Sequence, residues 1–579
     1  MDRLGKRVSR SVEKIEKKNM YFLATLSTDS LEKPERELSL KSSNIIVKKS
    51  DIPTNELIEN MGFEDGNSRM VVGWEINIYE NSDNVRKWFS GRTLFITGAT
   101  GFMGKVLLEK LLRCCPDIKR IYILCRPKKG YGANARFENL KKLPVFERLH
   151  QENPSAFKKI TIVEGDILQK DLGIQQFMKE RLINEVSVVI NGAASLRLEA
   201  GVKSSIQNNT SSTLKIIELS CEMKQLKAFV HISTAFCHCE YDVLEEIIYP
   251  SSFNPKDIIA AVEWIDESTL DIIKPRLLGP HPNCYTFSKR LSETLVAQYA
   301  SKIPVAIIRP SIVTPALMEP IPGWVDNLNG PVGIIIAAGK GLLRSMMVKE
   351  EYTAEVVPVD VAINTIILIT WERGRILKEK DECVPVYNIS NGDIQTLPWG
   401  EVFKQGRKIG YEHPFEAGLW YPNGTIRTNP VTHFLAIFFY QMIPAYFIDA
   451  LLFLTNQKTF MVRVQKKIYI GLQMLQYFTT RQWSFVNNNA REITKKLNEE
   501  EKKIFYVDNV RADVPVYFKN CILGARQYVM KEPLSTLPKA RVQQKVLYWL
   551  DWIVHIILYG TLFWFTYFGI GRLFKNYNV

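Results

Sequence analysis

The stretch from Thr93 to Gly104, TLFITGATGFMG, constrains the fold of this chain more than any other segment. An apolar run leads into three glycines, Gly98, Gly101 and Gly104, and then into leucines at helical spacing. The pattern predicts a strand, a tight turn and a helix, the unit that opens a dinucleotide-binding fold. A glycine-rich turn that binds no ligand is the alternative interpretation.

Each glycine of this turn has a distinct physical task. The first permits the turn, the second lets backbone N–H groups approach a pyrophosphate, and the third allows close packing of the helix on the strand. The phosphates would lie at the positive end of the helix. We therefore expect cofactor contacts from Thr97, Gly98, Thr100, Gly101, Phe102, Met103 and Gly104.

The residues after the next predicted strand bear on the choice of cofactor. Arg120–Cys125 has the apolar character of a strand and is followed by Arg126. An acidic side chain near this point would favour NAD, whereas an arginine suits the 2′-phosphate of NADP. The sequence therefore predicts NADPH, with a solvated basic loop as the alternative.

Two further predicted strands complete the expected cofactor site. Residues 160–166 end in Asp166, which could meet the adenine amine, with Ile167 beside it. Residues 186–190 are followed by Asn191, Ala193 and Ala194, whose small neighbours would leave room for the nicotinamide half.

The catalytic candidates follow in order along the chain. Ser233 and Thr234 come directly after the strand Ala228–Ile232, at the sheet edge where open α/β folds bind ligands. Tyr285 and Lys289 are four residues apart and share one helix face. We expect the lysine ammonium to lower the tyrosine pKa, so that the phenol can protonate a developing alkoxide. Ser233 or Thr234 would hold the carbonyl oxygen.

At this point the chain resembles the extended branch of the short-chain dehydrogenase/reductases and, within it, the fatty acyl-CoA reductases. The resemblance covers nearly everything after residue 85, including blocks at residues 98–116, 231–239, 308–314, 319–333 and 357–364. It implies an α/β fold with a Rossmann-type doubly wound parallel sheet, followed by a mostly helical C-terminal domain and a transmembrane helix.

The resemblance also implies a reaction and its residues. It assigns catalysis to Tyr285 and Lys289 with Thr234 or Ser233, and Asn209 matches a further conserved position of the family motif. The implied reaction is NADPH-dependent reduction of a long-chain fatty acyl-CoA to a primary alcohol through an aldehyde, with release of CoA. Two alternatives stay open: an extended reductase acting on another lipid carbonyl such as a steroid, and a non-catalytic nucleotide-binding membrane protein.

The length of 579 residues indicates more than one folded unit. We expect a basic, loosely attached or disordered extension over 1–90 and a reductase domain over 91–370. A linker over 371–430, a helical domain over 431–535 and a membrane anchor over 548–571 would follow.

The formal charge of +14 favours acidic partners such as lipid headgroups and the phosphates of the cofactor and CoA. Nucleic acid is not expected, because no zinc finger or recognition-helix pattern is found. Cys237-His238-Cys239 has no second ligand pair at zinc spacing, so we expect packing there and no metal.

The segment Trp552–Gly571 contains no Asp, Glu, Lys or Arg and is long enough to cross a bilayer. Basic residues are denser before it than after it, which predicts a cytosolic catalytic portion. The endoplasmic reticulum and the peroxisome are both open as the membrane that carries it. A second apolar segment, residues 433–454, contains Asp449 and favours a membrane-associated or substrate-lining helix over a second crossing.

The substrate pocket is expected between these regions. Residues 321–324 and 330–341 combine turn-forming and apolar residues, the mixture that flanks a greasy pocket. Lys340 and Arg344 could attract CoA phosphates or could lie on a solvated helix face.

Overall fold

A computed structural model describes residues 84–128, 130–376, 384–392, 394–507 and 511–576. The expected N-terminal extension therefore lies, up to residue 83, outside the described part. Its expected boundary at residue 90 is too late, because helix α2 (Val85–Phe89) is already part of the core, with Val85, Trp88 and Phe89 buried.

The core of the fold is a seven-stranded, wholly parallel sheet in the order β11-β7-β5-β4-β1-β2-β3. The strands are β1 (Thr93–Thr97), β2 (Arg120–Cys125), β3 (Ile160–Glu164), β4 (Val188–Asn191), β5 (Ala228–Ile232), β7 (Val305–Pro310) and β11 (Val386–Ile389). The order reverses between β1 and β4, which creates the crevice where such sheets bind dinucleotides. The Rossmann-type fold predicted from the sequence is confirmed.

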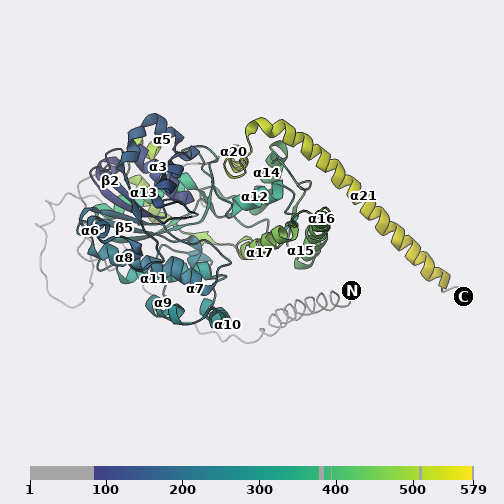
Figure 1. Cartoon of the computed structure of the whole chain (residues 1–579), viewed down its shortest axis with the longest axis horizontal. Helices are drawn as coiled ribbons and strands as arrows, with labels where there is room; N and C mark the ends of the chain where they lie inside the picture. The colour runs from purple at the N-terminus through teal and green to yellow at the C-terminus, as the bar shows by residue number, and fades with distance from the viewer. Residues whose placement is uncertain (1–83, 129, 377–383, 393, 508–510, 577–579) are drawn as a thin grey trace, which may run out of the picture. The chain divides into compact units, whose positions relative to one another are not determined.

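Helices cover both faces of this sheet, as Figure 1 shows. One face packs against α3 (Phe102–Cys114), α5 (Glu147–Glu152) and α13 (Val359–Arg375). The other packs against α6 (Gln176–Glu185), α8 (Ser212–Glu222) and α11 (Cys284–Gln298). Successive residues of β1 alternate between these faces: Leu94 and Ile96 join the first core, and Phe95 joins the second. Strands buried on both sides explain the unbroken apolar runs in the sequence.

Strand β11 corrects one predicted boundary. It pairs with β7 at the edge of the sheet, yet it lies within residues 371–430, which were expected to form a linker. Helix α13 likewise runs through the expected boundary at residue 370. The reason is physical: an edge strand can be supplied by a chain segment that first leaves the sheet, and a four-residue run carries little signal of its own.

Further helices belong to the sheet domain. They are α4 (Ala133–Lys141), α7 (Val202–Ser205), the π-helix η4 (Ile206–Ser211), α9 (Pro255–Trp264) and α10 (Glu267–Leu278). Helices α7, α9 and α10 form a small apolar cluster with α11.

Three two-stranded parallel ribbons lie outside the main sheet: β8 (Ile312–Thr314) with β10 (Val356–Pro358), β9 (Ser345–Met347) with β12 (Thr425–Arg427), and β6 (Val243–Leu244) with β13 (Ser484–Phe485). The C-terminal region is mostly helical: α12 (Pro331–Gly339), α14 (Trp399–Glu412), α15 (Pro430–Ile437), η6 (Phe438–Met442), α16 (Ile443–Leu454), α17 (Met461–Thr479), α18 (Asn488–Lys495), α19 (Glu499–Ile504), α20 (Val514–Gly524), η7 (Ala525–Val529) and α21 (Leu537–Asn576).

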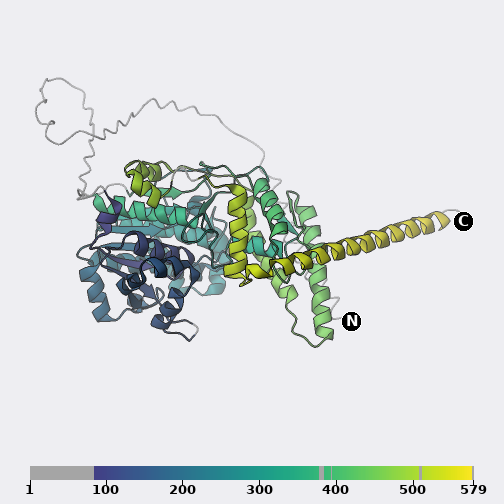
Figure 2. The same cartoon turned by 90° about the horizontal axis from the view of Figure 1, so that it is seen from above.

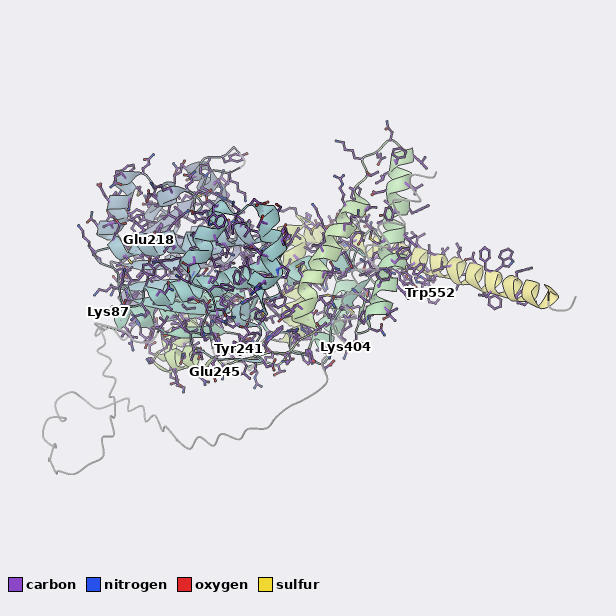
Figure 3. The ribbon with its side chains drawn as sticks, turned by 90° about the horizontal axis from the view of Figure 1, so that it is seen from below. Lys87, Glu218, Tyr241, Glu245, Lys404 and Trp552 are labelled. Atoms are coloured by element: carbon purple, nitrogen blue, oxygen red, sulfur yellow. The ribbon has the colours of Figure 1, made fainter. Side chains whose placement is uncertain are left out.

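Two described helical segments are long and apolar enough to cross a membrane, Pro430–Leu454 and Leu534–Phe568. The second belongs to α21, which begins before the expected anchor at residue 548. Figure 3 shows Trp552 on this helix and aromatic side chains standing away from it further along.

Candidate active site

The glycine turn between β1 and α3 is packed too closely for any side chain at two of its positions. Gly98 has φ +74°, and a Cβ there would lie 2.6 Å from the backbone of Gly192. A Cβ on Gly104 would lie 2.3 Å from the carbonyl oxygen of Gly98. Gly101 caps α3 without a side-chain hydrogen bond, so the first N–H groups of the helix stay directed toward the crevice. This cradle fits the pyrophosphate of a dinucleotide.

The other residues predicted in this turn lie around the same helix end. Thr100 lies in the turn itself, while Phe102 and Met103 form the first residues of α3. The ring of Phe102 stacks on Trp324 at a centroid distance of 5.4 Å. The turn is thereby connected to the C-terminal half of the protein.

A row of polar side chains links the ends of three neighbouring strands. Thr97, Asn191 and His231 are direct partners in the register of β1, β4 and β5. Thr97 Oγ1 donates to Asn191 Oδ1 at 2.7 Å, and Asn191 Nδ2 lies 3.2 Å from His231 Nδ1. Burial, with a further effect from Lys289, holds the pKa of His231 well below its usual value, so its ring is neutral at pH 7.

The loop after β4 is held by the same row. The backbone N–H of Ala193 donates to Thr97 Oγ1 at 3.1 Å, and Ala194 follows in the loop. These small residues lie beside the glycine turn. The sequence did not single out His231, because a lone histidine inside an apolar strand gives no signal of the strand register.

Arg126 and Asp166 lie on adjacent strand ends and form an ion pair at 3.3 Å. The Arg126 side chain is 47% exposed, so its guanidinium can reach a ligand in the crevice. Asp166 also accepts from the N–H of Leu168, and Ile167 packs against the second core. The pairing was not foreseen, since the two residues are forty positions apart.

The catalytic candidates come together at the end of β5. Lys289 Nζ donates to the carbonyl oxygen of Ile232 at 2.6 Å, and Lys289 is buried. The Tyr285 hydroxyl is hydrogen-bonded to the side chain of Thr234, which also caps the short helix that follows by accepting from the N–H of Phe236. Of the two hydroxyl candidates, Thr234 lies at Tyr285, whereas the Ser233 hydroxyl is buried beside Cys237.

The pKa of Tyr285 differs from the value expected from the sequence, which was a lowered one. Burial lowers the pKa of Lys289 to about 8, with Glu293 opposing the shift. Burial raises the pKa of Tyr285, with the hydrogen bond to Thr234 opposing it. The prediction that Lys289 lowers the pKa of Tyr285 is therefore wrong for this structure. Lys289 points at the carbonyl of Ile232, and desolvation of the tyrosine is the largest effect on its pKa. Tyr285 is protonated at neutral pH, as a proton donor must be.

Asn209 connects the tyrosine helix with the loop after β4. Its Nδ2 donates to Ser288 Oγ on α11 at 2.9 Å, and its Oδ1 accepts from the N–H of Ser195 at 2.8 Å. Asn209 lies in the π-helix η4, a widened helical turn of the kind often found at functional sites. Its contacts position Tyr285 and Lys289 on either side of Ser288.

A cluster of buried charged and polar side chains packs next to the catalytic candidates. Glu293, one turn after Lys289, accepts from Arg309 at 2.6 and 2.9 Å and lies 3.1 Å from His238 Nε2 and from Cys237 Sγ. Ligand atoms of Cys237, His238 and Glu293 lie within 4.8 Å of one another. Arg309 bonds both oxygens of Glu293, so the carboxylate is committed to a buried ion pair. Sequence spacing missed Glu293, which lies 55 residues after His238.

An apolar cavity of about 160 Å³ lies between α12, α14 and α20. Its lining includes Ile334, Ile335, Phe403, Phe415, Phe518 and Ile522. The loop residue Gly323 packs directly against Asn520 of α20. The helix within 330–341 thus lines an apolar pocket, whereas the loop at 321–324 packs on α20 and is not part of the lining.

Side chains near the cavity pack toward both halves of the candidate site. Phe102 of the glycine turn packs on the cluster of Val332, Ile336 and Phe518. Ile312 of β8 packs on the cluster that contains Phe236 and on the one that contains Leu343. Figure 1 shows α12, α14 and α20 grouped beside the sheet domain.

Lys340 and Arg344 are not available as phosphate ligands on a helix face. Lys340 Nζ donates to the carbonyl of Glu416 and pairs with Glu532 at 2.9 Å. Arg344 is buried and pairs with Asp551 of α21 at 3.4 Å. Both cations connect parts of the C-terminal half.

The fold and the glycine cradle define a nucleotide-dependent reductase of the short-chain dehydrogenase/reductase type. Two sequence models of a family described as male sterility protein match, one a nucleotide-binding model over residues 96–366 and the other over residues 440–532. Among solved structures, the terminal reductase domain of the myxalamid pathway is 19% identical with a TM-score of 0.50 and covers 75% of this chain and 90% of its own. The reductase domain of a nonribosomal peptide synthetase from Mycobacterium tuberculosis is 17% identical at the same TM-score, with 77% and 97% covered. These two structures support the fold.

Curated relatives are more specific. The chain is 35% identical to fatty acyl-CoA reductase 1 of Gallus gallus over 458 residues, 79% of this chain and 88% of the relative. It is 34% identical to fatty acyl-CoA reductase 2 of Bos taurus over 461 residues, 80% of this chain and 89% of the relative. The chain belongs to the fatty acyl-CoA reductase family. It is an NAD(P)-dependent reductase, and the family assignment made from the sequence is confirmed.

Proposed function

We propose that this enzyme reduces long-chain fatty acyl-CoA to a primary fatty alcohol, with release of CoA and consumption of two NADPH. The names of its relatives support the substrate class. The observation that carries the chemistry is the hydroxyl pair of Tyr285 and Thr234 at the end of β5, with Lys289 one helical turn from the tyrosine. A protonated phenol and a second hydroxyl at one place can both donate to a developing oxyanion.

The reduced nicotinamide supplies hydride to the carbonyl carbon of the substrate. In the first reduction, Tyr285 and Thr234 hold the thioester oxygen as negative charge develops on it. As the oxyanion re-forms the carbonyl, the carbon–sulfur bond breaks, CoA leaves as the thiolate and takes a proton from solvent, and an aldehyde remains. In the second reduction, Tyr285 transfers its proton to the aldehyde oxygen, which gives the alcohol.

The supporting residues act by position and charge. Lys289, held by the carbonyl of Ile232, places an ammonium one helical turn from the tyrosine. Asn209 fixes α11 through Ser288. Glu293 and Arg309 keep the loop that follows Thr234 attached to the same helix through Cys237 and His238.

NADPH is the proposed cofactor, bound along Thr97–Gly104, Asp166, Ile167, Asn191, Ala193 and Ala194. The guanidinium of Arg126 is exposed directly after the second strand, and this is the part of the fold that binds the 2′-phosphate of NADP in related enzymes. The phosphate would compete with Asp166 for Arg126, and a dianion in an exposed place is the stronger partner.

The apolar cavity is the proposed site of the acyl chain. Its walls are formed by side chains of α12, α14 and α20, and its neighbours reach both the glycine turn and the loop after β5. We propose a reductase domain over residues 91–370, completed by β11, and a helical domain over residues 431–535 that closes this cavity.

The enzyme is proposed to be anchored in the endoplasmic reticulum or peroxisomal membrane by α21, with the catalytic part in the cytosol. The apolar stretch Leu534–Phe568 supports the anchor. Basic residues before the anchor, including Lys539, Arg541 and Lys545, support the orientation.

The test uses membranes that contain the full chain, supplied with NADPH and acyl-CoAs of different length. We expect one CoA and one alcohol for every two NADPH oxidised, and no product with Tyr285→Phe. Tyr299→Phe, at the end of the same helix, is the matched control and should stay active. Turnover of a sterol ketone without any thioester reduction, or cofactor binding without turnover, would overturn the proposal in favour of the corresponding alternative.

A further inference from the structure

The helix formed by α15, η6 and α16 exposes a broad apolar face to its surroundings. Only 17% of its most apolar window is buried, although the mean hydropathy of that window is 1.7. We call this surface the outer face; it consists of Val431, Phe434, Leu435, Phe438, Phe439, Ile443, Tyr446, Phe447, Leu451, Phe453 and Leu454. Phe447 is 63% and Leu454 78% exposed. Contiguous apolar surface of this kind marks a site that something else covers.

The opposite face of the same helix is attached to the protein by polar contacts. Gln441 is buried, and its Oε1 accepts from the N–H of Arg344 at 2.9 Å. Its Nε2 donates to Gln465 of α17 at 3.2 Å, and Gln465 donates to the carbonyl of Leu342 at 3.0 Å. Near the helix start, His433 Nδ1 is hydrogen-bonded to Ser345 at 2.7 Å.

Helix α17 returns the chain to the place where α15 began. Thr479, its last residue, donates to the carbonyl of Met347 at 2.7 Å, on the same strand β9 that carries Ser345. The turn is held by Asp449, whose carboxylate accepts from the N–H groups of Phe460, Met461 and Val462 at the start of α17. Figure 2 shows α16 and α17 as neighbouring green helices that project from the body and join at their outer ends.

These contacts leave too little helix for a crossing. Because Gln441 is held against the body, only Met442–Leu454 can project beyond it, and thirteen residues of helix are about 20 Å long. The hydrocarbon layer is about 30 Å thick. A crossing would also leave the polar turn at 455–459 and the exposed Arg463 within the hydrocarbon.

Charge favours a lipid surface as the occupant. Lys458, Arg463, Lys466 and Lys467 are exposed along the turn and the return helix, and Asp449 is the one acidic residue in the sequence from Pro430 to Thr479. An apolar, aromatic face bordered by lysines and arginines is the composition of helices that lie in the membrane interface.

The helix that carries the outer face also contacts the proposed anchor. The rings of Tyr440 in η6 and His555 in α21 stack at a centroid distance of 6.1 Å. The hairpin therefore lies beside α21 where this helix leaves the body, at the level where a bilayer surface would begin.

We propose that residues 430–479 form a monotopic hairpin, with the outer face inserted in the interface of a bilayer that contains anionic phospholipids. Both of its ends, and its turn, remain on the side of the catalytic body. The hairpin adds a second attachment to the membrane besides α21, and it orients the body relative to the lipid surface.

The side on which the turn lies can be measured in sealed vesicles of phosphatidylcholine and phosphatidylserine that contain the full chain. Cys221 is the one exposed cysteine among the described thiols, so it reports the outward-facing molecules. Asn456→Cys in a Cys221→Ser background should react with a membrane-impermeant maleimide to the same extent as Cys221 does in the parent, and Cys221→Ser alone gives the blank. Reaction of Asn456→Cys only after detergent would show that the turn has crossed and would overturn the proposal.

Contact with lipid is measured with a photoreactive phenylalanine at three positions in the same vesicles. We expect a probe at Phe447 to cross-link to phospholipid at least fivefold more than one at Ala445, on the buried side of the same helix, or at Trp264 on remote α9. Lys466→Glu with Lys467→Glu should lower the Phe447 yield with phosphatidylserine and leave it unchanged in pure phosphatidylcholine. Equal yields at Phe447 and Trp264, or cross-links from Phe447 to a second copy of the chain, would overturn the proposal.

Discussion

At the scale of single residues, the candidate site depends on how buried groups share charge. Lys289 is an ammonium inside the protein, and Glu293 is its nearest compensating charge. The carboxylate of Glu293 is in turn bonded by Arg309, so the three form a chain of alternating sign below Tyr285. The net effect of burial and Glu293 leaves the pKa of Lys289 at about 8.

This pKa predicts an alkaline limit to activity. Since the lysine pKa is lowered from about 10.5, the ammonium is present below about pH 8 and is lost as the pH rises through that value. We expect kcat to fall above pH 8. Lys289→Arg, which stays charged, should be slower but should lack this decline between pH 7.5 and 9.5. A pH profile of kcat for both proteins is the measurement, and identical profiles would show that another group titrates.

The exposed position of Arg126 after the second strand leads to a prediction about the preference for NADPH over NADH. Removing its guanidinium takes a charged partner away from the 2′-phosphate, worth about 1.4 kcal/mol or tenfold in affinity. Arg126→Ala should therefore raise the KM for NADPH about tenfold and leave that for NADH nearly unchanged. Lys128→Ala, on the same exposed loop, is the control. An equal loss for both cofactors would place phosphate recognition elsewhere.

At the scale of elements, the strand-turn-helix unit is the part whose shape follows most directly from sequence. Gly98 and Gly104 are required by contacts of 2.6 and 2.3 Å that a Cβ would make, and both glycines were predicted from their spacing. The segment at 430–479 is the contrasting case. Its apolar residues and Asp449 left a crossing and a surface helix open, because the partner of Asp449 is the start of the returning helix α17.

Gly98 and Gly91 have similar φ values, so an alanine substitution at each can distinguish the effect of backbone strain from that of a steric clash. Gly98 has φ +74° and Gly91 has φ +69°, but nothing lies within 4 Å of a Cβ on Gly91. An alanine at either position adds about 1 kcal/mol of backbone strain. We expect Gly91→Ala to lower the melting temperature slightly and to bind cofactor normally, whereas Gly98→Ala should lose binding because Gly192 must move. Both are measured by thermal unfolding with and without NADPH; a Gly98→Ala protein that retains full affinity would contradict the cradle.

At the scale of the whole described molecule, buried charges connect segments that are far apart in sequence. Glu319 accepts from Lys110 of α3 and from Arg148 of α5. Asp551 of α21 bonds Arg344, Trp420 and Asn423. The first half of α21, the helix proposed as the anchor, is thereby part of the folded body.

The Asp551 contacts predict a loss of stability on their removal. Asp551→Ala leaves the buried Arg344 without its carboxylate, which should lower the free energy of unfolding by about 3 kcal/mol. Asp271→Ala, at an exposed position of α10, should have little effect. Denaturant unfolding of the full chain in detergent compares them. Equal stability of the two variants would show that α21 is not held by this pair.

The local pattern along the chain was enough to predict the glycine turn, the spacing of Tyr285 and Lys289 and the apolar C-terminal helix, because each depends on neighbours within a few residues. The doubly wound parallel sheet was an implication of the family resemblance. The choice of Thr234 over Ser233 at Tyr285, the pairing of Arg126 with Asp166, the burial of Lys340 and Arg344, and the place of β11 all depend on segments tens to hundreds of residues apart. Such contacts are set by packing and by which charges are taken out of water together, and no periodicity in the chain records them.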